Sequence, residues 1–150
     1  VPVPDFKSYF DTYAKCLKLR EGQTLHFELG RAVVAQCGSL FTRVLYVKEG
    51  TAKKFVIVDA GMTDLIRPAL YNAYHKIENL SADGKKEVYD VVGPICESSD
   101  VFAKAIDLDE CHRGDMIALR SAGAYGEIMA SGYNCRKLPV GYTTEDLSNI

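Results

Sequence analysis

The stretch that decides the fold of this chain is Phe55-Val56-Ile57-Val58-Asp59-Ala60-Gly61-Met62-Thr63-Asp64-Leu65-Ile66-Arg67-Pro68-Ala69-Leu70-Tyr71. Its first four residues are all apolar, which is typical of a β-strand buried on both faces. Residues 67–73 then predict a short helix, because Pro68 falls near the first turn, where its missing N–H breaks no helical hydrogen bond. A buried strand followed by a turn and a short helix indicates a β domain with small helical insertions.

Segments on both sides of this stretch extend the β pattern. Residues 32–47 predict a long strand, interrupted near Gly38 by a bend or bulge. Glu49-Gly50-Thr51 predicts a hairpin turn into the buried strand, and further strands are predicted at 87–92 and 116–119. The sequence therefore predicts a mainly β fold with minor α content, built largely from antiparallel strands.

The first 30 residues predict a different type of secondary structure from the β-rich remainder. Residues 5–18 predict an amphipathic helix with Asp5 as N-cap, and 24–29 predict one strand. The helix has a wide aromatic face, and so short an α/β unit cannot bury its own faces. We therefore expect the chain to be the C-terminal part of a larger protein. A complete single domain is the alternative.

Composition narrows the class of protein. The chain has 150 residues, 47% hydrophobic and 25% charged, with a net charge of −2, which argues against a nucleic-acid partner. No apolar run approaches the roughly 20 residues that span a bilayer. Five cysteines, an odd number without CxxC spacing, argue against a metal site or a disulfide framework. These observations predict a cytoplasmic protein with no membrane, nucleic-acid or metal partner.

Two polar constellations bring together groups that suit an anion. In Glu28-Leu29-Gly30-Arg31, the glycine lets backbone N–H groups approach an anion, and the arginine can fork a carboxylate or phosphate. Arg67 and Tyr71 lie four residues apart, so a helical turn would point both the same way. The alternative for Arg31 is a surface ion pair. The alternative for the second pair is that Arg67 is a helix-end charge and Tyr71 a core aromatic.

Two further constellations offer a proton donor and a phenol. In Gly93-Pro94-Ile95-Cys96-Glu97-Ser98-Ser99-Asp100, a thiol that can donate a proton stands beside a carboxylate that can hold a cation. The alternative for Cys96 is a buried small hydrophobe. In Ser121-Ala122-Gly123-Ala124-Tyr125-Gly126, small residues flank one tyrosine, so backbone and phenol can both approach a ligand.

In this order the four strings resemble the C-terminal half of the diaminopimelate decarboxylases, which are alanine-racemase-like, fold-type III pyridoxal-phosphate enzymes. The resemblance covers residues from about Asp5 to Arg136. It implies three parts: 1–30, the last helix and strand of a pyridoxal-phosphate-binding TIM barrel; 31–136, a C-terminal antiparallel β-barrel or Greek-key-like domain; and 137–150, a polar tail.

The resemblance also implies roles for individual residues. Residues 28–31 match a Glu-Pro-Gly-Arg motif, with Leu29 in place of the proline. The resemblance implies cofactor-binding roles for Glu28, Gly30, Arg31 and Tyr125. It implies substrate-binding roles for Arg31, Arg67, Tyr71, Glu97 and Tyr125. Arg67 and Tyr71 would bind the substrate's distal carboxylate end and Glu97 its far amino group.

Cys96 matches the catalytic proton donor of the family. The family's cofactor, pyridoxal 5'-phosphate, accepts the electrons released when carbon dioxide leaves, and a thiol can then protonate the carbon. In the family, the cysteine loop comes from a second subunit. The resemblance thus implies a homodimer with shared active sites.

The implied reaction converts meso-2,6-diaminopimelate to L-lysine and carbon dioxide, a step of lysine biosynthesis. The family's cofactor lysine and much of its phosphate loop match nothing in these residues, so we expect the chain alone to be inactive. The alternatives are a related decarboxylase acting on carboxynorspermidine, ornithine or arginine, and a non-catalytic β module for dimerisation or partner binding. Related decarboxylases of basic amino acids typically carry aspartate after the cysteine and lack the arginine-tyrosine pair, so Glu97 with Arg67 favours diaminopimelate over ornithine or arginine.

Overall fold

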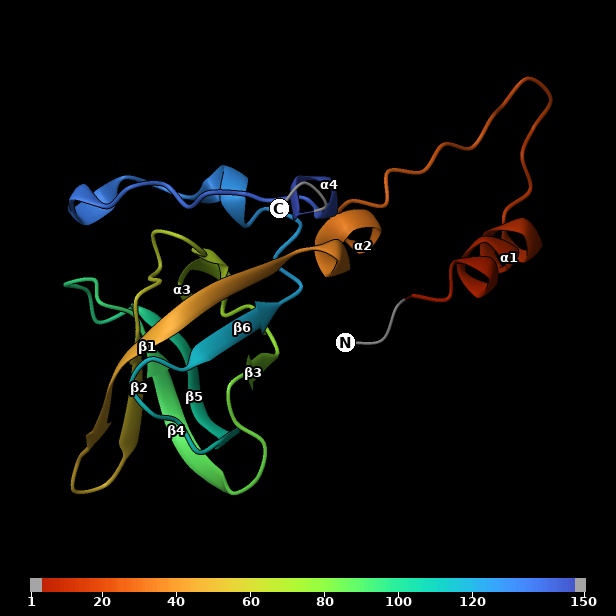
Figure 1. Ribbon diagram of the computed structural model, residues 1–150. Helices are drawn as coiled ribbons and strands as arrows, with labels where there is room; N and C mark the ends of the chain where they lie inside the picture. The colour runs from red at the N-terminus through yellow and green to blue at the C-terminus, as the bar shows by residue number, and fades with distance from the viewer. Residues whose placement is uncertain (1–3, 148–150) are drawn as a thin grey trace.

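One six-stranded sheet forms the body of the protein, which a computed structural model describes for residues 4–147 (Figure 1). Its strand order is β3-β6-β1-β2-β4-β5. The strands are β1 (Ser39–Glu49), β2 (Lys54–Val58), β3 (Ile77–Asn79), β4 (Lys86–Val92), β5 (Val101–Asp109) and β6 (Met116–Arg120). The helices are α1 (Phe6–Cys16), α2 (Arg31–Val34), α3 (Arg67–Tyr71) and α4 (Thr144–Leu147), with short 3-10 turns η1 (Ala35–Cys37), η2 (Glu127–Met129) and η3 (Tyr133–Cys135).

The sheet curls into a nearly closed barrel, which confirms the predicted mainly β fold. The long strand β1 pairs antiparallel with β6 through its first half and with β2 through its second half. The two edge strands β3 and β5 approach each other across the opening. One pair, β2 with β4, is parallel, so the sheet is not antiparallel throughout.

The core lies inside this curl. Val44, Val56, Val58 and Val91 are at most 1% exposed, and Leu65 joins them from the turn after β2. Apolar burial of this kind is the main favourable term in folding. Phe55 and Ile57 are only half-buried. The prediction that β2 is buried on both faces is therefore wrong for one face. The barrel has one inner face, and alternate residues of β2 point towards it.

Two predicted local features, the β1–β2 turn and the helix after β2, are confirmed. The turn between β1 and β2 closes where the Gly50 N–H donates to the Lys53 carbonyl over 2.8 Å. α3 begins at Arg67 with Pro68 in its first turn, and it ends at Asn72, whose φ of 51° is left-handed. Asparagine is one of the few residues that tolerate this conformation, and it stops the helix.

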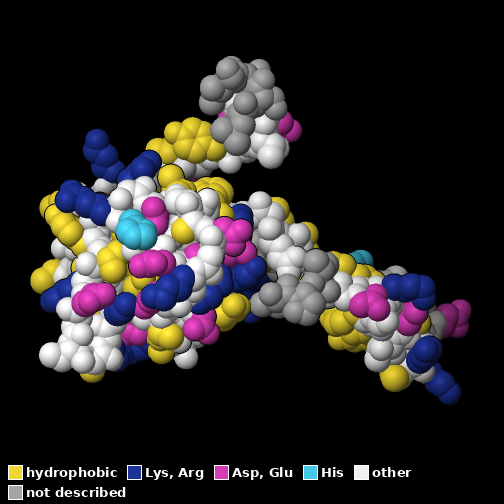
Figure 2. Space-filling view, turned by 60° about the horizontal axis from the view of Figure 1, so that its bottom comes forward, with side chains coloured by type: hydrophobic (Ala, Val, Ile, Leu, Met, Phe, Trp, Pro, Cys, Tyr) yellow, Lys and Arg dark blue, Asp and Glu magenta, His cyan; other side chains and the backbone are white. Residues whose placement is uncertain are grey.

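The N-terminal segment differs from its prediction. α1 forms with the Asp5 side chain accepting from the Ser8 N–H, as predicted, but none of its residues is buried. The predicted strand at 24–29 is absent, because no neighbouring strand pairs with these residues within the described chain. Phe27 instead packs against the exposed aromatic rings of α1, 4.8 Å from the Phe10 ring centre. Figure 2 shows hydrophobic side chains on this projecting arm.

Three further predictions need correction or completion. Residues 31–37 are helical (α2 and η1), so the strand predicted from 32 begins only at Ser39. Strands β3 and β5 were not predicted; in β5 the alternation of buried and exposed residues is broken by Ala105, whose φ is 50°. The polar tail contains the short helix α4. No helix among residues 4–147 is long and apolar enough to cross a membrane.

Candidate functional site

A surface hollow of about 590 Å³ brings together four of the predicted site residues. We call it the arginine hollow, and its lining is Arg31, Arg67, Tyr71, Ala73, Tyr125 and Met129. These residues come from α2, α3, the loop after β6 and η2, which are up to 98 residues apart in sequence (129 minus 31). The fold therefore assembles a site that no local spacing contains.

Two glycines explain why Arg31 and Tyr125 line the same hollow. The backbones at Gly38 and Gly123 touch so closely that a Cβ on Gly38 would lie 2.5 Å from the Gly123 Cα. The Gly123 N–H donates to the Ala35 carbonyl at 2.9 Å, and Ala122 N–H donates to the Gly38 carbonyl at 2.9 Å. This contact holds the α2–η1 segment against the turn that carries Tyr125. The small residues of 121–126 therefore serve backbone packing.

Arg67 is a buried cation that lines the arginine hollow. It is 8% exposed, and its guanidinium carbon lies 5.2 Å from the Tyr71 ring centre and 6.0 Å from that of Tyr125. Within residues 4–147 no carboxylate forms an ion pair with it. An uncompensated charge is costly to bury. Aromatic faces offset only part of that cost, so the site favours an anionic ligand.

His75 adds no second buried charge beside Arg67. Its Nδ1 lies 2.9 Å from the Arg120 carbonyl oxygen, and the ring is buried. Burial lowers the pKa of His75, and the charge of Arg67 lowers it further against the opposing effect of the carbonyl. These effects favour the neutral imidazole, so Arg67 is the buried positive charge at this place.

The turn that carries Tyr125 into the arginine hollow contains two residues with a strained backbone. Ser121 and Tyr125 have φ values of 61° and 60°, in the left-handed region that side chains rarely adopt. Such conformations cost about 1–3 kcal/mol each and persist where surrounding contacts hold them. The strained turn presents the half-exposed Tyr125 ring towards the Arg67 guanidinium.

Cys96 and Glu97 lie on a separate element, which we call the Cys96 loop (residues 93–100). It follows β4, as the Gly-Pro turn predicted, and both side chains are exposed. The alternative of a buried small hydrophobe for Cys96 is therefore wrong. Neither residue lines the arginine hollow of the same chain.

Two residues that the sequence did not single out support the Cys96 loop. The Tyr133 hydroxyl donates to Glu97 Oε1 at 2.9 Å, and this acceptor raises the pKa of Tyr133. The carboxylate of Asp100, which is 3% exposed, accepts from the N–H groups of Ile95 and Met62. Asp100 lay inside the quoted motif, and a buried aspartate after a tight turn is a usual acceptor for backbone N–H groups. Tyr133 had no local signal.

The remaining predicted residues, Glu28 and Gly30, precede Arg31 in the chain and are not among the residues that line the arginine hollow. Glu28 is exposed and does not line it. Gly30 precedes α2 with a φ of 58°, a conformation that favours glycine, and a Cβ there would meet nothing within 4 Å. Its backbone is therefore open to a ligand, and Arg31 follows directly.

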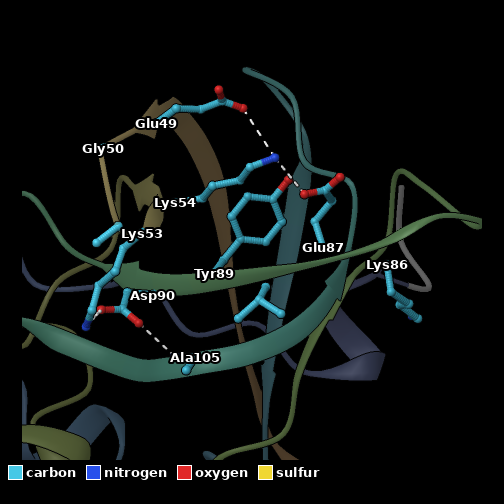
Figure 3. Close-up of a pocket in the computed structure, with 11 residues that line it drawn as sticks. Glu49, Gly50, Lys53, Lys54, Lys86, Glu87, Tyr89, Asp90 and Ala105 are labelled. Atoms are coloured by element: carbon cyan, nitrogen blue, oxygen red, sulfur yellow. Dashed lines mark hydrogen bonds and ion pairs between the residues drawn. The ribbon is translucent and has the colours of Figure 1, made fainter.

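A second hollow, of about 640 Å³, lies between the β1–β2 hairpin, β4 and β5 and contains none of the predicted residues (Figure 3). Its charged groups are paired: Lys54 bonds Glu87 at 2.6 Å and Lys53 bonds Asp90 at 2.9 Å. Asp90 also accepts from the Ala105 N–H, where β5 bulges. Because these charges compensate one another, this hollow has no free charge comparable to Arg67. Among residues 4–147, no cluster of histidine, cysteine and acidic side chains is suited to a metal ion.

Comparison with known proteins places these observations in a family. The chain is 77% identical over 145 residues to a diaminopimelate decarboxylase from Bacteroides thetaiotaomicron, covering 97% of this chain and 38% of that protein. It resembles the structure of diaminopimelate decarboxylase from M. jannaschii in co-complex with L-lysine, with a TM-score of 0.76 and 41% identity, over 89% of this chain and 30% of that one. The lysine/ornithine decarboxylase of Vibrio vulnificus, complexed with cadaverine, is more distant, with a TM-score of 0.65 and 25% identity over 72% of this chain and 30% of that one.

The chain thus spans well under half the length of the relatives it matches. The model of the pyridoxal-dependent decarboxylase C-terminal sheet domain matches residues 12–123, which include the whole six-stranded sheet, the arginine hollow except Met129 and Tyr125, and the Cys96 loop. The resemblance inferred from the four polar strings is therefore confirmed. The chain belongs to the pyridoxal-dependent decarboxylase family, of which it contains the C-terminal sheet domain.

Proposed function

We propose that this chain is the C-terminal part of a decarboxylase that converts meso-2,6-diaminopimelate to L-lysine and carbon dioxide. The observation that carries the proposal is Arg67, a buried guanidinium without a carboxylate partner in the described chain, flanked by two phenols and close to Arg31. Diaminopimelate has a second carboxylate at its far end, which the diamine-producing substrates lack. The identity of 77% to a protein named diaminopimelate decarboxylase supports the same substrate.

The residues around Gly30 fit the phosphate of pyridoxal phosphate. The open backbone at Gly30, the guanidinium of Arg31 and the hydroxyl of Tyr125 offer the donors that a phosphate accepts. We assign Glu28 to the same loop, since it precedes Gly30 by two residues. When bound, the cofactor supplies an electron sink for the pair released with carbon dioxide.

The chain's own residues would divide the remaining work. Arg67, Arg31 and Tyr71 hold the distal carboxylate through charge-assisted hydrogen bonds, which fixes the orientation of the substrate. Glu97 holds the distal ammonium group. Cys96 Sγ delivers a proton to the carbon from which carbon dioxide has left, so the thiol acts as a general acid.

We further propose a homodimer in which the Cys96 loop of one chain completes the arginine hollow of the other. Supporting this, Cys96 and Glu97 do not line the hollow of their own chain, and both are exposed. We assign 1–30 to the end of a cofactor-binding barrel, 31–136 to the β domain and 137–150 to a tail. Five cysteines that are all free suit a reducing compartment, and we propose the cytoplasm.

The test is a substrate panel with the full-length protein and pyridoxal phosphate. Carbon dioxide release is measured from meso-diaminopimelate, carboxynorspermidine, L-ornithine and L-arginine at equal concentration. We expect meso-diaminopimelate to be turned over at least about 100-fold faster than ornithine or arginine, since these leave the guanidinium without its anion. Preference for ornithine, arginine or carboxynorspermidine would reassign the substrate.

The chain alone is the second arm of this experiment. We expect it to show no turnover, and dialysis to remove added pyridoxal phosphate, because the cofactor lysine of the family has no counterpart in it. A retained chromophore fixed by borohydride would contradict this expectation. A panel without any turnover by the full-length protein would favour a non-catalytic β module.

A further inference from the structure

We propose that Asp100 is a positioning residue, whose carboxylate sets the place of Cys96 by tying the Cys96 loop to the turn before α3. The inference rests on the proposed function for the role of Cys96, but its geometry stands independently. Asp100 is 3% exposed and belongs to neither the arginine hollow nor the exposed tip of the loop. A carboxylate buried at that level must have its charge compensated by donors.

Those donors come from two segments of chain. Asp100 Oδ2 accepts from the Ile95 N–H at 2.7 Å, inside the loop. Asp100 Oδ1 accepts from the Met62 N–H at 2.6 Å, in the turn that follows β2 and leads to Arg67. Each oxygen thus holds one segment, and one side chain links the loop of the proton donor to the turn that positions the guanidinium. Charge-assisted hydrogen bonds are about twice as strong as neutral ones.

The backbone of the loop is closed around the same residue. The Gly93 N–H donates to the Asp100 carbonyl at 3.1 Å, and the Asp100 N–H donates to the Glu97 carbonyl at 3.1 Å. The Glu97 N–H donates to the Ile95 carbonyl at 2.8 Å. Cys96 therefore lies between two residues whose backbone positions depend on Asp100. Glu97 is also held by the Tyr133 hydroxyl. The position of Cys96 therefore depends on Asp100 more strongly than the position of Glu97 does.

Two glycines make room for the carboxylate. A Cβ on Gly93 would lie 2.4 and 2.6 Å from the two Asp100 oxygens, and a Cβ on Gly61 would lie 3.3 Å from Oδ1. The burial of Asp100 raises its pKa, with Asp64 acting in the same direction and Arg136 and the two backbone donors opposing. The glycines and donors together form a socket that fits one carboxyl group with both oxygens accepting hydrogen bonds.

The test is Asp100→Asn in the full-length enzyme, since the amide keeps the shape but presents N–H₂ where one backbone N–H needs an acceptor. We expect hydrogen exchange to accelerate at least about tenfold in the amides of 93–97 or of 61–63. We also expect kcat for meso-diaminopimelate to fall about 10- to 100-fold while KM changes less than about threefold, because the misplaced group is the proton donor. Asp107→Asn on the exposed part of β5 is the matched control and should leave both readouts unchanged.

Gly93→Ala is the second variant, because its methyl group displaces the carboxylate without changing any charge. It should reproduce the loss of kcat. Unchanged kcat in both folded variants would overturn the positioning role. A fall in kcat matched by an equal rise in KM would overturn it as well. Failure of both variants to fold would also overturn it, because Asp100 would then be purely structural. Absence of turnover in the wild-type enzyme would refute the proposed function instead. The exchange measurement would then still decide whether Asp100 holds the loop.

Discussion

The arginine hollow and the Cys96 loop are built in opposite ways. The arginine hollow keeps Arg67 buried, packed against rings and without an acidic partner in residues 4–147. The Cys96 loop exposes its reactive groups and buries the aspartate that holds them. A buried unpaired cation needs a ligand to compensate it, whereas an exposed thiol needs a surface to approach. We propose that the first region receives a substrate and that the second is inserted into a partner's site.

Arg67→Ala is the sharpest way to break this comparison. In the full-length enzyme we expect kcat/KM for meso-diaminopimelate to fall at least about 100-fold, which corresponds to about 3 kcal/mol of lost charge-assisted binding. Arg113→Ala is the matched control, since its guanidinium also stacks on a tyrosine, 5.0 Å from the Tyr46 ring centre, but is exposed. It should change kcat/KM less than about twofold. Equal effects of the two variants would contradict the role of Arg67.

Gly123→Ala tests how the arginine hollow is assembled. The added Cβ would lie 2.2 Å from the Val34 carbonyl oxygen and 2.8 Å from the Gly38 nitrogen, so the backbones must separate. We expect the free energy of unfolding, measured by urea denaturation, to fall by about 1–3 kcal/mol. Gly132→Ala, whose Cβ would make an ordinary 3.6 Å contact, is the control and should change it by less than about 0.5 kcal/mol. Similar values for both would show that the contact at Gly38 has no energetic importance.

Tyr133→Phe probes the support of Glu97 in the Cys96 loop. Removing the hydroxyl that donates to Glu97 should raise KM for meso-diaminopimelate about 3- to 10-fold, because the carboxylate loses its orientation. Tyr142→Phe in the same C-terminal segment, at an exposed tyrosine, is the control. An unchanged KM in Tyr133→Phe would remove Tyr133 from the site.

Glu87→Gln measures a smaller effect, in a hollow without a proposed ligand. The partners Lys54 and Lys85 lower the pKa of Glu87 from 4.5 to about 2. Because the folded pKa lies below the unfolded one, the pair stabilises the fold above pH 4.5 and this contribution is lost as the pH falls towards 2. Thermal melts across this window should show a weaker pH dependence in Glu87→Gln than in wild type. Identical pH dependence would contradict the assignment.

Local chemistry made part of the fold predictable. Pro68 and the apolar run before Asp59 indicated α3 and β2 because proline geometry and strand burial act within a few residues. The strand predicted at 24–29 is absent from the described chain, because a strand forms only where a neighbour pairs with it. Strand β5 was missed because Lys104 and the bulge at Ala105 interrupt its alternation.

The candidate site was predictable in its residues but not in its assembly. Arg67 and Tyr71 share a helical turn, so their contact followed from spacing. Arg31 and Tyr125 line one hollow because Ser39 pairs with Arg120 and Gly38 contacts Gly123, and no short sequence pattern contains these contacts. The support of Glu97 by Tyr133 joins residues 36 apart and had no sequence signal.

The most direct test of the account mixes two inactive full-length enzymes. One has Arg67→Ala and the other Cys96→Ala, so each homodimer lacks one of the two regions in every active site. If the Cys96 loop of one chain completes the arginine hollow of its partner, random exchange should restore about a quarter of wild-type turnover of meso-diaminopimelate, because half the dimers then contain one intact site. No recovery, despite exchange of subunits confirmed by mass spectrometry, would contradict the proposal that the two regions meet across a dimer.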